Sequence, residues 1–223
     1  GADKVRGAAI QPLTCQHVIL DKDLTEVKYL DQGAPPLSVL QVVGDAVTLD
    51  SRDAGRKALM ESWGYTVTVI DDSDSQASFD AAAAAADVVL VTGSVVSATL
   101  GNQLTGSTSG IVNEIAGMLD NFGFSSSTTA AVNTDGFTKT DAAHYITEPF
   151  SGNPVTVFTT SMLLSMPSGI LAPDLQNAGE IAGNAVLVTL DTGALRYDST
   201  PSPARRAHLP FAAAETNELT ADG

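Results

Sequence analysis

From residue 38 onward, short apolar runs alternate with segments of helical character. Residues 38–44 form a short apolar run ending in glycine, and residues 51–63 follow with helical spacing. The pattern repeats with an apolar run at 66–70, an alanine-rich segment at 76–86 and a third apolar run at 87–92. Continuous apolar runs of this length are typical of strands buried on both faces of a parallel sheet. The alternation therefore predicts an α/β domain.

The first predicted helix has clear boundary signals. Ser51 is a good N-cap residue, and Gly64 suits the left-handed conformation that ends helices. Ala58, Leu59 and Trp63 are expected on one face of this helix.

The second half of the chain shows a different pattern, with mainly short extended segments. A short helical piece is expected near residues 98–104, a fourth strand at 111–115 and a helical turn at 118–122. Short extended segments with turn residues between them then predict β-hairpins. These strand candidates are residues 128–132, 155–159, 185–190, 194–197 and 205–211.

Residues 1–37 stand apart from this pattern as an N-terminal extension. Residues 18–20 and 27–30 are strand candidates, and residues 31–36 read as a linker. Two short strands cannot build a core. We expect the extension to join the main sheet, to pack on it, or to pair with a neighbouring molecule. It contains the single cysteine, Cys15, whose role the sequence leaves open and which can form no intrachain disulfide.

Charge excludes several classes of partner. The 223 residues include 26 acidic and 11 basic side chains, for a formal net charge of −15. Nucleic-acid binding needs clustered Lys and Arg, so we expect no nucleic-acid partner for this acidic chain. Anionic membrane surfaces also repel a chain of this negative charge. No apolar run approaches the length of a membrane-spanning helix, so no membrane insertion is expected. The acidic, lysine-poor, Ser/Thr-rich composition is typical of exported proteins and predicts an extracellular or cell-surface location.

Several short sequence motifs within residues 38–223 together resemble those of one superfamily. They are VLQVVGD at 39–45, LMESWGYTVTV at 59–69, DVVLVTGS at 87–94, HYITEPF at 144–150 and ARR at 204–206. In this order they are similar to the class I glutamine amidotransferase-like superfamily, on the trehalose-utilisation (ThuA-like) side, in a secreted bacterial variant. The resemblance implies a flavodoxin-like three-layer α/β sandwich with a mostly parallel sheet and a final helix that would follow Gly223.

The chain lacks the catalytic motifs of that superfamily. The family's nucleophile is a cysteine in a strand-to-helix elbow, and the corresponding residues 112–117 contain none. Cys15 lies upstream of the domain, and His208 is not followed by the family's His-x-Glu pattern. Glutamine hydrolysis is therefore not expected, and the sequence favours a chain that is not an enzyme.

Three residues remain as catalytic candidates: Glu114, His144 and Ser94. Glu114 lies in the elbow region, where a buried carboxylate can act as an acid or base; the structural alternative is a carboxylate that accepts backbone N–H groups. His144 can serve as a base or can hold a turn, with Asp141 as its partner. Ser94 follows the third strand but lies in no Gly-x-Ser-x-Gly elbow. The structural interpretation is favoured for Glu114 and His144.

No cofactor is expected, with Ca²⁺ as the one alternative. Asp71, Asp72 and Asp74 follow the second strand and offer oxygen ligands, but they form no recognised calcium loop, and a solvated acidic loop is favoured. Residues 44–48 lack the glycine and lysine pattern of a phosphate-binding loop. The pair Arg205 and Arg206 either grips an anion or neutralises local acidic repulsion, and the second interpretation is favoured.

Two functions follow from these observations. The first is a non-catalytic extracellular structural or interaction module that binds a protein partner or itself, through residues 1–37. The alternative is a ThuA-like carbohydrate-acting enzyme or sugar-binding domain with its site at the C-terminal edge of the sheet. Convergence of Glu114, His144, Ser94 and the Asp71 cluster on one pocket would favour the alternative.

Overall fold

The computed structural model describes residues 16–20, 27–31, 37–128, 132–212, 214 and 216–220. The chain divides into two compact units, Gly1–Pro36 and Leu37–Gly223. In the first unit, β1 (Gln16–Leu20) pairs antiparallel with β2 (Val27–Asp31). Both strands expected in the N-terminal extension are present, and together they form a two-stranded structure, the N-terminal ribbon.

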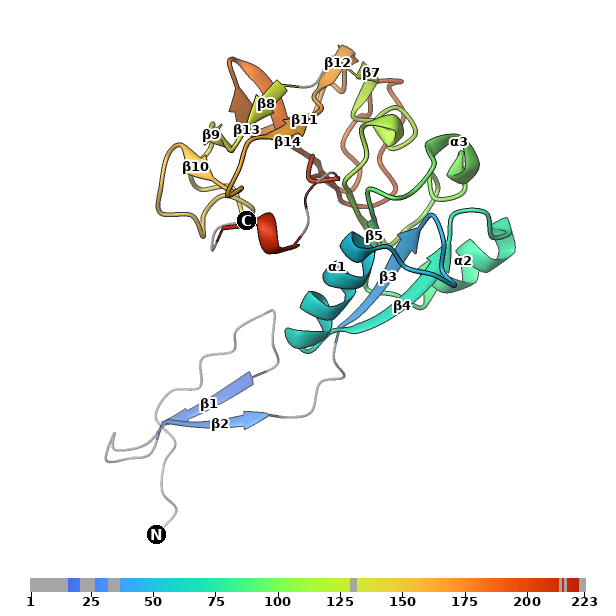
Figure 1. Ribbon diagram of the computed structural model, residues 1–223, viewed down its shortest axis with the longest axis vertical. Helices are drawn as coiled ribbons and strands as arrows, with labels where there is room; N and C mark the ends of the chain where they lie inside the picture. Colours follow the sequence, from blue (N-terminus) through green and yellow to red (C-terminus); the bar gives the residue numbers. More distant parts are fainter. Residues whose placement is uncertain are drawn as a thin grey trace. The chain divides into compact units, whose positions relative to one another are not determined.

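The second unit is built on one nine-stranded sheet (Figure 1), in the order β10–β9–β13–β14–β15–β6–β5–β3–β4. The four neighbouring pairs from β15 to β4 are parallel, and the four from β10 to β15 are antiparallel. The sheet is therefore mixed, and not mostly parallel as expected, because strands of the second half join the same sheet. Its strands are β3 (Ser38–Val43), β4 (Thr66–Asp71), β5 (Val88–Val91), β6 (Gly110–Asn113), β9 (Gly136–Lys139), β10 (Val155–Thr156), β13 (Gln176–Ile181), β14 (Asn184–Leu190) and β15 (Arg206–His208).

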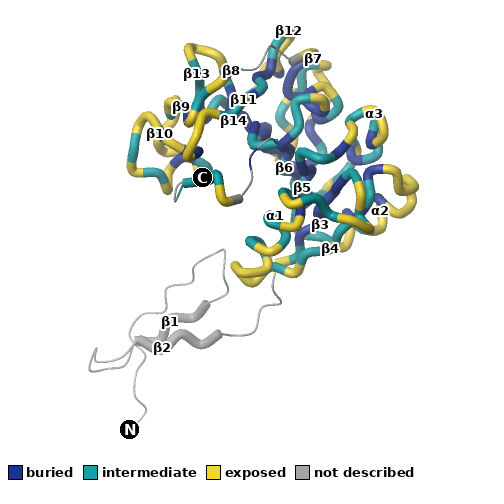
Figure 2. Tube along the Cα trace, viewed as in Figure 1, coloured by how far each residue is buried: buried dark blue, intermediate teal, exposed yellow. Residues whose placement is uncertain are grey.

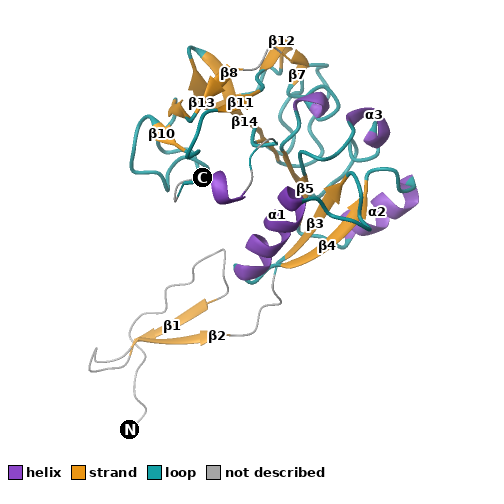
Figure 3. Cartoon of the chain, viewed as in Figure 1, coloured by secondary structure: helices purple, strands orange, loops and turns teal. Residues whose placement is uncertain are grey.

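Most of the helices lie beside the parallel half of the sheet (Figure 3). They are α1 (Ser51–Ser62), α2 (Gln76–Ala84), α3 (Ser97–Leu100) and the short 3-10 helix η1 (Ala116–Met118); a second one, η2 (Thr216–Glu218), lies near the end of the chain. The expected turn at 118–122 is thus a 3-10 turn that begins earlier. Across the described residues, no helix is long and apolar enough to cross a membrane.

The ends of α1 follow local chemistry. The N-cap is Asp50, one residue before the expected Ser51, and its Oδ1 accepts the Asp53 N–H at 2.8 Å. Asp is as good a cap as Ser, and its charge also suits the helix N-terminus. Gly64 follows the helix with φ +89°, the left-handed conformation that its sequence position predicts.

The buried residues of α1 are charged, and Arg56 shares one side of the helix with Leu59 and Trp63. The buried residues of α1 are Asp53 and Arg56, whereas Trp63 at its end is 64% exposed. Leu59 and Trp63 line the same cavity as Arg56, as their expected common face predicts, whereas Ala58 is exposed. Charged residues are buried on α1 because the helix lies against polar groups at the ends of the strands, which Asp53 and Arg56 contact.

Successive side chains of β3 point to opposite faces of the sheet, and a different helix lies on each face. Leu40 and Val42 belong to an apolar core that includes Phe79 of α2, while the intervening Gln41 bonds to the Asp53 carbonyl in α1 at 2.9 Å. The two helices therefore lie on opposite faces of β3. A second apolar core lies in the antiparallel half, around Phe137 and Phe158. Figure 2 shows the buried segments concentrated in the central strands.

Two small sheets complete the second half. β8 (Val132–Thr134) pairs with β11 (Met162–Leu164), and β7 (Ser125–Thr128) pairs with β12 (Pro167–Leu171). The strand expected at 128–132 corresponds to the end of β7 and the start of β8, and residues 129–131 lie outside the described ones. The segment expected as a strand at 194–197 is a turn with one isolated bridge, Leu195 to Pro201.

Candidate functional site

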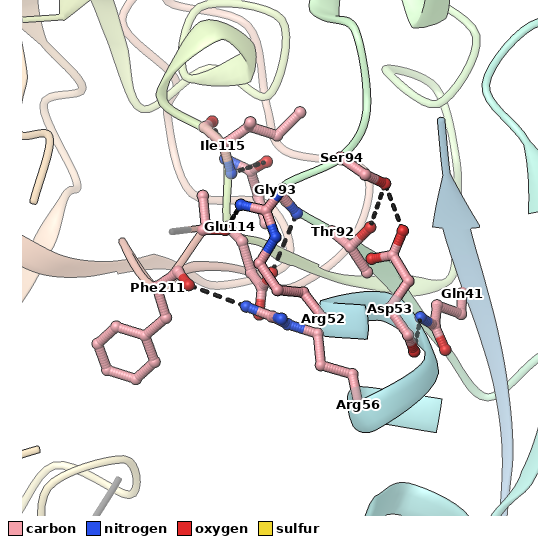
Figure 4. Close-up of polar contacts among 12 residues, drawn as sticks. Gln41, Arg52, Asp53, Arg56, Thr92, Gly93, Ser94, Glu114, Ile115 and Phe211 are labelled. Atoms are coloured by element: carbon pink, nitrogen blue, oxygen red, sulfur yellow. Dashed lines mark hydrogen bonds and ion pairs between the residues drawn. The ribbon is translucent and has the colours of Figure 1, made fainter. Parts of the chain in front are cut away.

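Polar side chains gather where the parallel strands β3, β5 and β6 end. Gly44 follows β3, Thr92 to Ser94 follow β5, and Glu114 follows β6, while the first turns of α1 lie beside them (Figure 4). In open sheets with parallel strands, ligands bind at this edge, at the point where the strand order reverses direction. Here that point lies between β3 and β5, so the edge is the first place to look for chemistry.

Glu114 is held by a buried ion pair. Its Oε1 accepts a hydrogen bond from Arg56 Nε at 2.7 Å, and its Oε2 accepts the Gly93 N–H at 3.1 Å. Both side chains are at least nine-tenths buried. Burial raises the pKa of Glu114, against the opposing effect of the Arg56 charge. The carboxylate does accept a backbone N–H, as one interpretation predicted, but its main partner is a guanidinium on α1.

Ser94 bonds to a second acidic side chain of α1. Its Oγ donates to Asp53 Oδ2 at 2.5 Å and accepts the Gly44 N–H at 3.0 Å. Thr92 Oγ1 lies 3.2 Å from the same hydroxyl and donates to the Val42 carbonyl. Ser94 therefore connects β3, β5 and α1. Two oxygens of the network, Asp53 Oδ1 and Gln41 Oε1, have no donor among the described residues.

The chain itself covers this edge. Residues 209–212, here called the strap, run from β15 across the ends of the strands. The Phe211 carbonyl accepts a hydrogen bond from Arg56 Nη2 at 2.9 Å, and the Ala212 carbonyl accepts one from Arg52 Nη1 at 3.2 Å. A Cβ at Gly93 would meet the Ala212 oxygen at 2.2 Å, so only glycine allows this approach. The strap therefore occupies the space directly above Gly93.

The predicted acidic cluster of Asp71, Asp72 and Asp74 does not share one environment. Asp71 accepts the N–H groups of Ala46 and Ser73, and Asp72 Oδ2 accepts the Val96 N–H at 2.6 Å. Asp72 is only 3% exposed, which corrects the expectation of a solvated loop for this residue, whereas Asp74 is exposed. Burial raises the pKa of Asp72. Among the described residues, no group of three His, Cys, Asp or Glu side chains is arranged to hold a metal ion.

His144 lies away from the other candidates, in the antiparallel half. Its Nε2 is 3.1 Å from Thr189 Oγ1 and 3.2 Å from Gln176 Oε1, and its Nδ1 accepts the Ile146 N–H. These bonds hold a turn against β13 and β14. Asp141, the partner expected for it, instead accepts the Ala143 N–H. The structure thus brings Glu114 and Ser94 together and leaves His144 out.

The two late arginines have different roles. Arg205 forms an exposed ion pair with Asp191 at 3.1 Å, which agrees with the neutralising role expected for both. Arg206 is fully buried and donates to the Thr105 carbonyl at 2.7 Å and to Ser202 Oγ at 3.3 Å. Burial, with a smaller contribution from Arg196, lowers the pKa of Arg206 to about 10. Arg206 therefore fastens the start of β15 to the 105 loop and forms no ion pair with an acid in the described part of the chain.

Sequence reasoning missed the α1 side of the network. Asp53 and Arg56 were not candidates, because charged residues on a helix are mostly exposed. One signal was available: Asp53 and Arg56 are three residues apart and therefore lie on one side of the helix. Gln41, a polar residue inside an otherwise apolar strand, was a second signal that this side of β3 meets a polar neighbour.

An apolar groove lies on the sheet face that carries α1. Leu90, Val112 and Ala207 stand side by side in register on β5, β6 and β15. Two mainly apolar cavities of about 240 and 210 Å³ open along this face and share Leu209. Leu90 and Val112 remain only half-buried. Central parallel strands are normally covered on both faces, so this groove is an uncommonly open part of the sheet.

A scan of the sequence against protein-family models matches no family, and a search among curated proteins returns no match.

Proposed function

We propose that this chain is a non-catalytic extracellular module that acts by binding protein, including copies of itself. One observation carries the proposal: the groups with catalytic potential at the C-terminal edge are already bonded to other parts of the chain. Glu114 uses both oxygens on Arg56 and Gly93, and Ser94 bonds to Asp53 and Gly44. Residues that hold strands, a helix and a strap together serve as structural links.

The strand order supports a finer proposal for the fold. Numbered along the chain, the five parallel strands β4–β3–β5–β6–β15 follow the order 2-1-3-4-5. This is the flavodoxin-like order. We therefore propose a flavodoxin-like three-layer core, related to the ThuA-like side of the amidotransferase-like superfamily, to which the antiparallel strands are added at one edge.

Two further features support binding over catalysis. The apolar groove beside α1 offers a surface suited to protein contact, since contiguous exposed apolar area commonly marks interaction sites. The carbohydrate-acting alternative relied on Glu114, Ser94 and His144 in one pocket, and His144 instead bonds to Thr189 and Gln176. We therefore favour the interaction module.

Sedimentation analysis of the full chain and of a variant without residues 1–36 tests the proposal. Leu37 is kept because its carbonyl accepts the Thr66 N–H. We expect the full chain to self-associate reversibly, and the shortened variant to be a monomer with an unchanged unfolding transition. A full chain that stays monomeric up to millimolar concentration, or a deletion that leaves association unchanged, would contradict the proposal.

A further inference from the structure

The edge strand β4 leaves a regular row of backbone groups without a strand partner. β4 pairs with β3 in six consecutive register steps without a bulge, and on its other side no strand pairs with it in the described part of the chain. The Thr66 N–H donates to the Leu37 carbonyl, and the Asp72 N–H donates to the Val43 carbonyl. Because backbone groups alternate in direction along a strand, those of Val67 and Val69 point outward.

This edge also lacks the usual protection. Natural edge strands carry Lys, Pro or a bulge that prevents pairing with another chain. The five residues Thr66 to Ile70 contain no charge and no proline, and four of them are β-branched Thr or Val, followed by the β-branched Ile70. The one charged residue of β4 is Asp71 at its end, so in a chain of net charge −15 the uncharged stretch Thr66–Ile70 is a place where another strand can pair with little repulsion.

The N-terminal ribbon has the properties of the missing strand partner. β1 and β2 have five residues each, one fewer than the six of β4. Within the described residues each of them pairs only with the other, and an isolated two-stranded ribbon is marginally stable in water. Residues 1–36 carry four basic and five acidic side chains, whereas the remaining residues carry seven and 21. Nearly all of the excess negative charge therefore lies outside the ribbon's unit.

We propose that the outer edge of β4 accepts the N-terminal ribbon of a second copy of this chain, which extends the nine-stranded sheet across two molecules. This inference rests on the proposed function and names the acceptor site for self-association. The contact is made by backbone hydrogen bonds at Val67 and Val69, and strand addition of this kind needs little from the side chains. Because each copy has both a donor ribbon and an acceptor edge, the contact can propagate into chains or close into rings.

Residue-resolved amide hydrogen exchange tests the acceptor edge directly. At concentrations where the full chain associates, the amides of Val67 and Val69 are expected to exchange at least about tenfold more slowly than in the variant without residues 1–36. The amide of Thr68 faces β3 and is expected to exchange at a similar rate in both. Equal exchange at Val67 and Val69 in the two samples would overturn the proposal, and so would protection of these amides in a monomeric full chain.

Edge variants provide the matching functional test. Val69→Pro removes an outward N–H and no hydrogen bond to β3, and Thr68→Lys adds the charge that natural edges carry. Each is expected to weaken self-association at least about tenfold with a cooperative unfolding transition retained. The matched control is Thr99→Lys, an exposed threonine on α3, which should associate like the parent chain. If Thr68→Lys folds and associates normally while the deletion abolishes association, the β4 proposal fails and the proposed function stands.

Discussion

Arg56 and Glu114 form a buried ion pair that joins α1 to the end of β6, with Nε and Oε1 2.7 Å apart. Each partner makes a second bond, Arg56 to the strap and Glu114 to the backbone of the loop after β5. One pair of side chains thus connects four segments that are distant in the sequence. This cross-linking accounts for the burial of the Arg56 charge on α1.

Breaking this pair should destabilise the fold strongly. Arg56→Ala leaves the Glu114 carboxylate buried without its counter-charge, and we expect a loss of about 3–5 kcal/mol in the free energy of unfolding. Urea denaturation measures this. The control is Lys57→Ala, which removes an exposed pair with Glu61 on the same helix and should cost less than about 1 kcal/mol. Equal effects of the two variants would contradict a structural role for the buried pair.

Gly93 should not tolerate even the smallest side chain. In Gly93→Ala, the new Cβ would meet the Ala212 carbonyl oxygen and displace the strap, so we expect a loss of about 1–3 kcal/mol. At Gly106 a Cβ would meet no atom within 4 Å, which makes Gly106→Ala the matched control. Thermal unfolding of both variants checks the prediction, and a Gly93→Ala protein as stable as its control would show that the strap does not press on Gly93.

His208 should make stability depend on pH. Complete burial lowers the pKa of His208 to about 4, from 6.5, although the Asn113 and Ser165 carbonyls oppose the shift. Between these values the unfolded chain binds a proton that the folded chain does not, so stability falls as pH decreases from about 6.5 to 4, by up to about 3 kcal/mol. The difference in unfolding free energy between the parent chain and His208→Gln isolates this contribution. A difference that stays constant over this pH range would contradict it.

Self-association should strengthen with salt. Copies of a chain with net charge −15 repel one another, and the Debye length falls from about 30 Å at 0.01 M ionic strength to about 3 Å at 1 M. We therefore expect the dissociation constant measured by sedimentation to decrease over this range. Association that weakens with added salt would mean that attraction between charges, and not backbone pairing along the uncharged stretch Thr66–Ile70, holds the copies together.

The parallel half of the fold was predictable from the sequence because its signals are local. The apolar runs of β3, β4 and β5 and the stop at Gly64 specify their own structure. The antiparallel strands were harder to predict. β13, for example, contains Gln176, Asn177, Gly179 and Glu180, and it is a strand because β14 and β9 supply its hydrogen bonds. Such strands depend on partners that are distant in the sequence, and so does the sheet they join.

The candidate site was predictable only in part, for the same reason. Ser94 follows a predicted strand and Glu114 lies near the end of another, predicted at 111–115, so the sequence placed both at the correct edge. Their partners Arg56 and Asp53 come from a helix whose rotation about its axis depends on tertiary contacts. His144 lies in the motif at 144–150, but its position in the sequence gives no indication that its side chain faces Thr189 of β14.

A double-mutant cycle on Asp53 and Ser94 tests most directly whether the polar network at the C-terminal edge holds the fold together. Ser94→Ala, Asp53→Asn and the double variant would be compared with the parent chain by urea unfolding. We predict that both single variants are destabilised and that the pair has a coupling energy of about 1.5–3 kcal/mol, as expected for a partly buried hydrogen bond to a charged group. Active-site groups are commonly held at a cost in stability. Single variants that are as stable as the parent chain, or more stable, would therefore contradict the structural role and support a catalytic one.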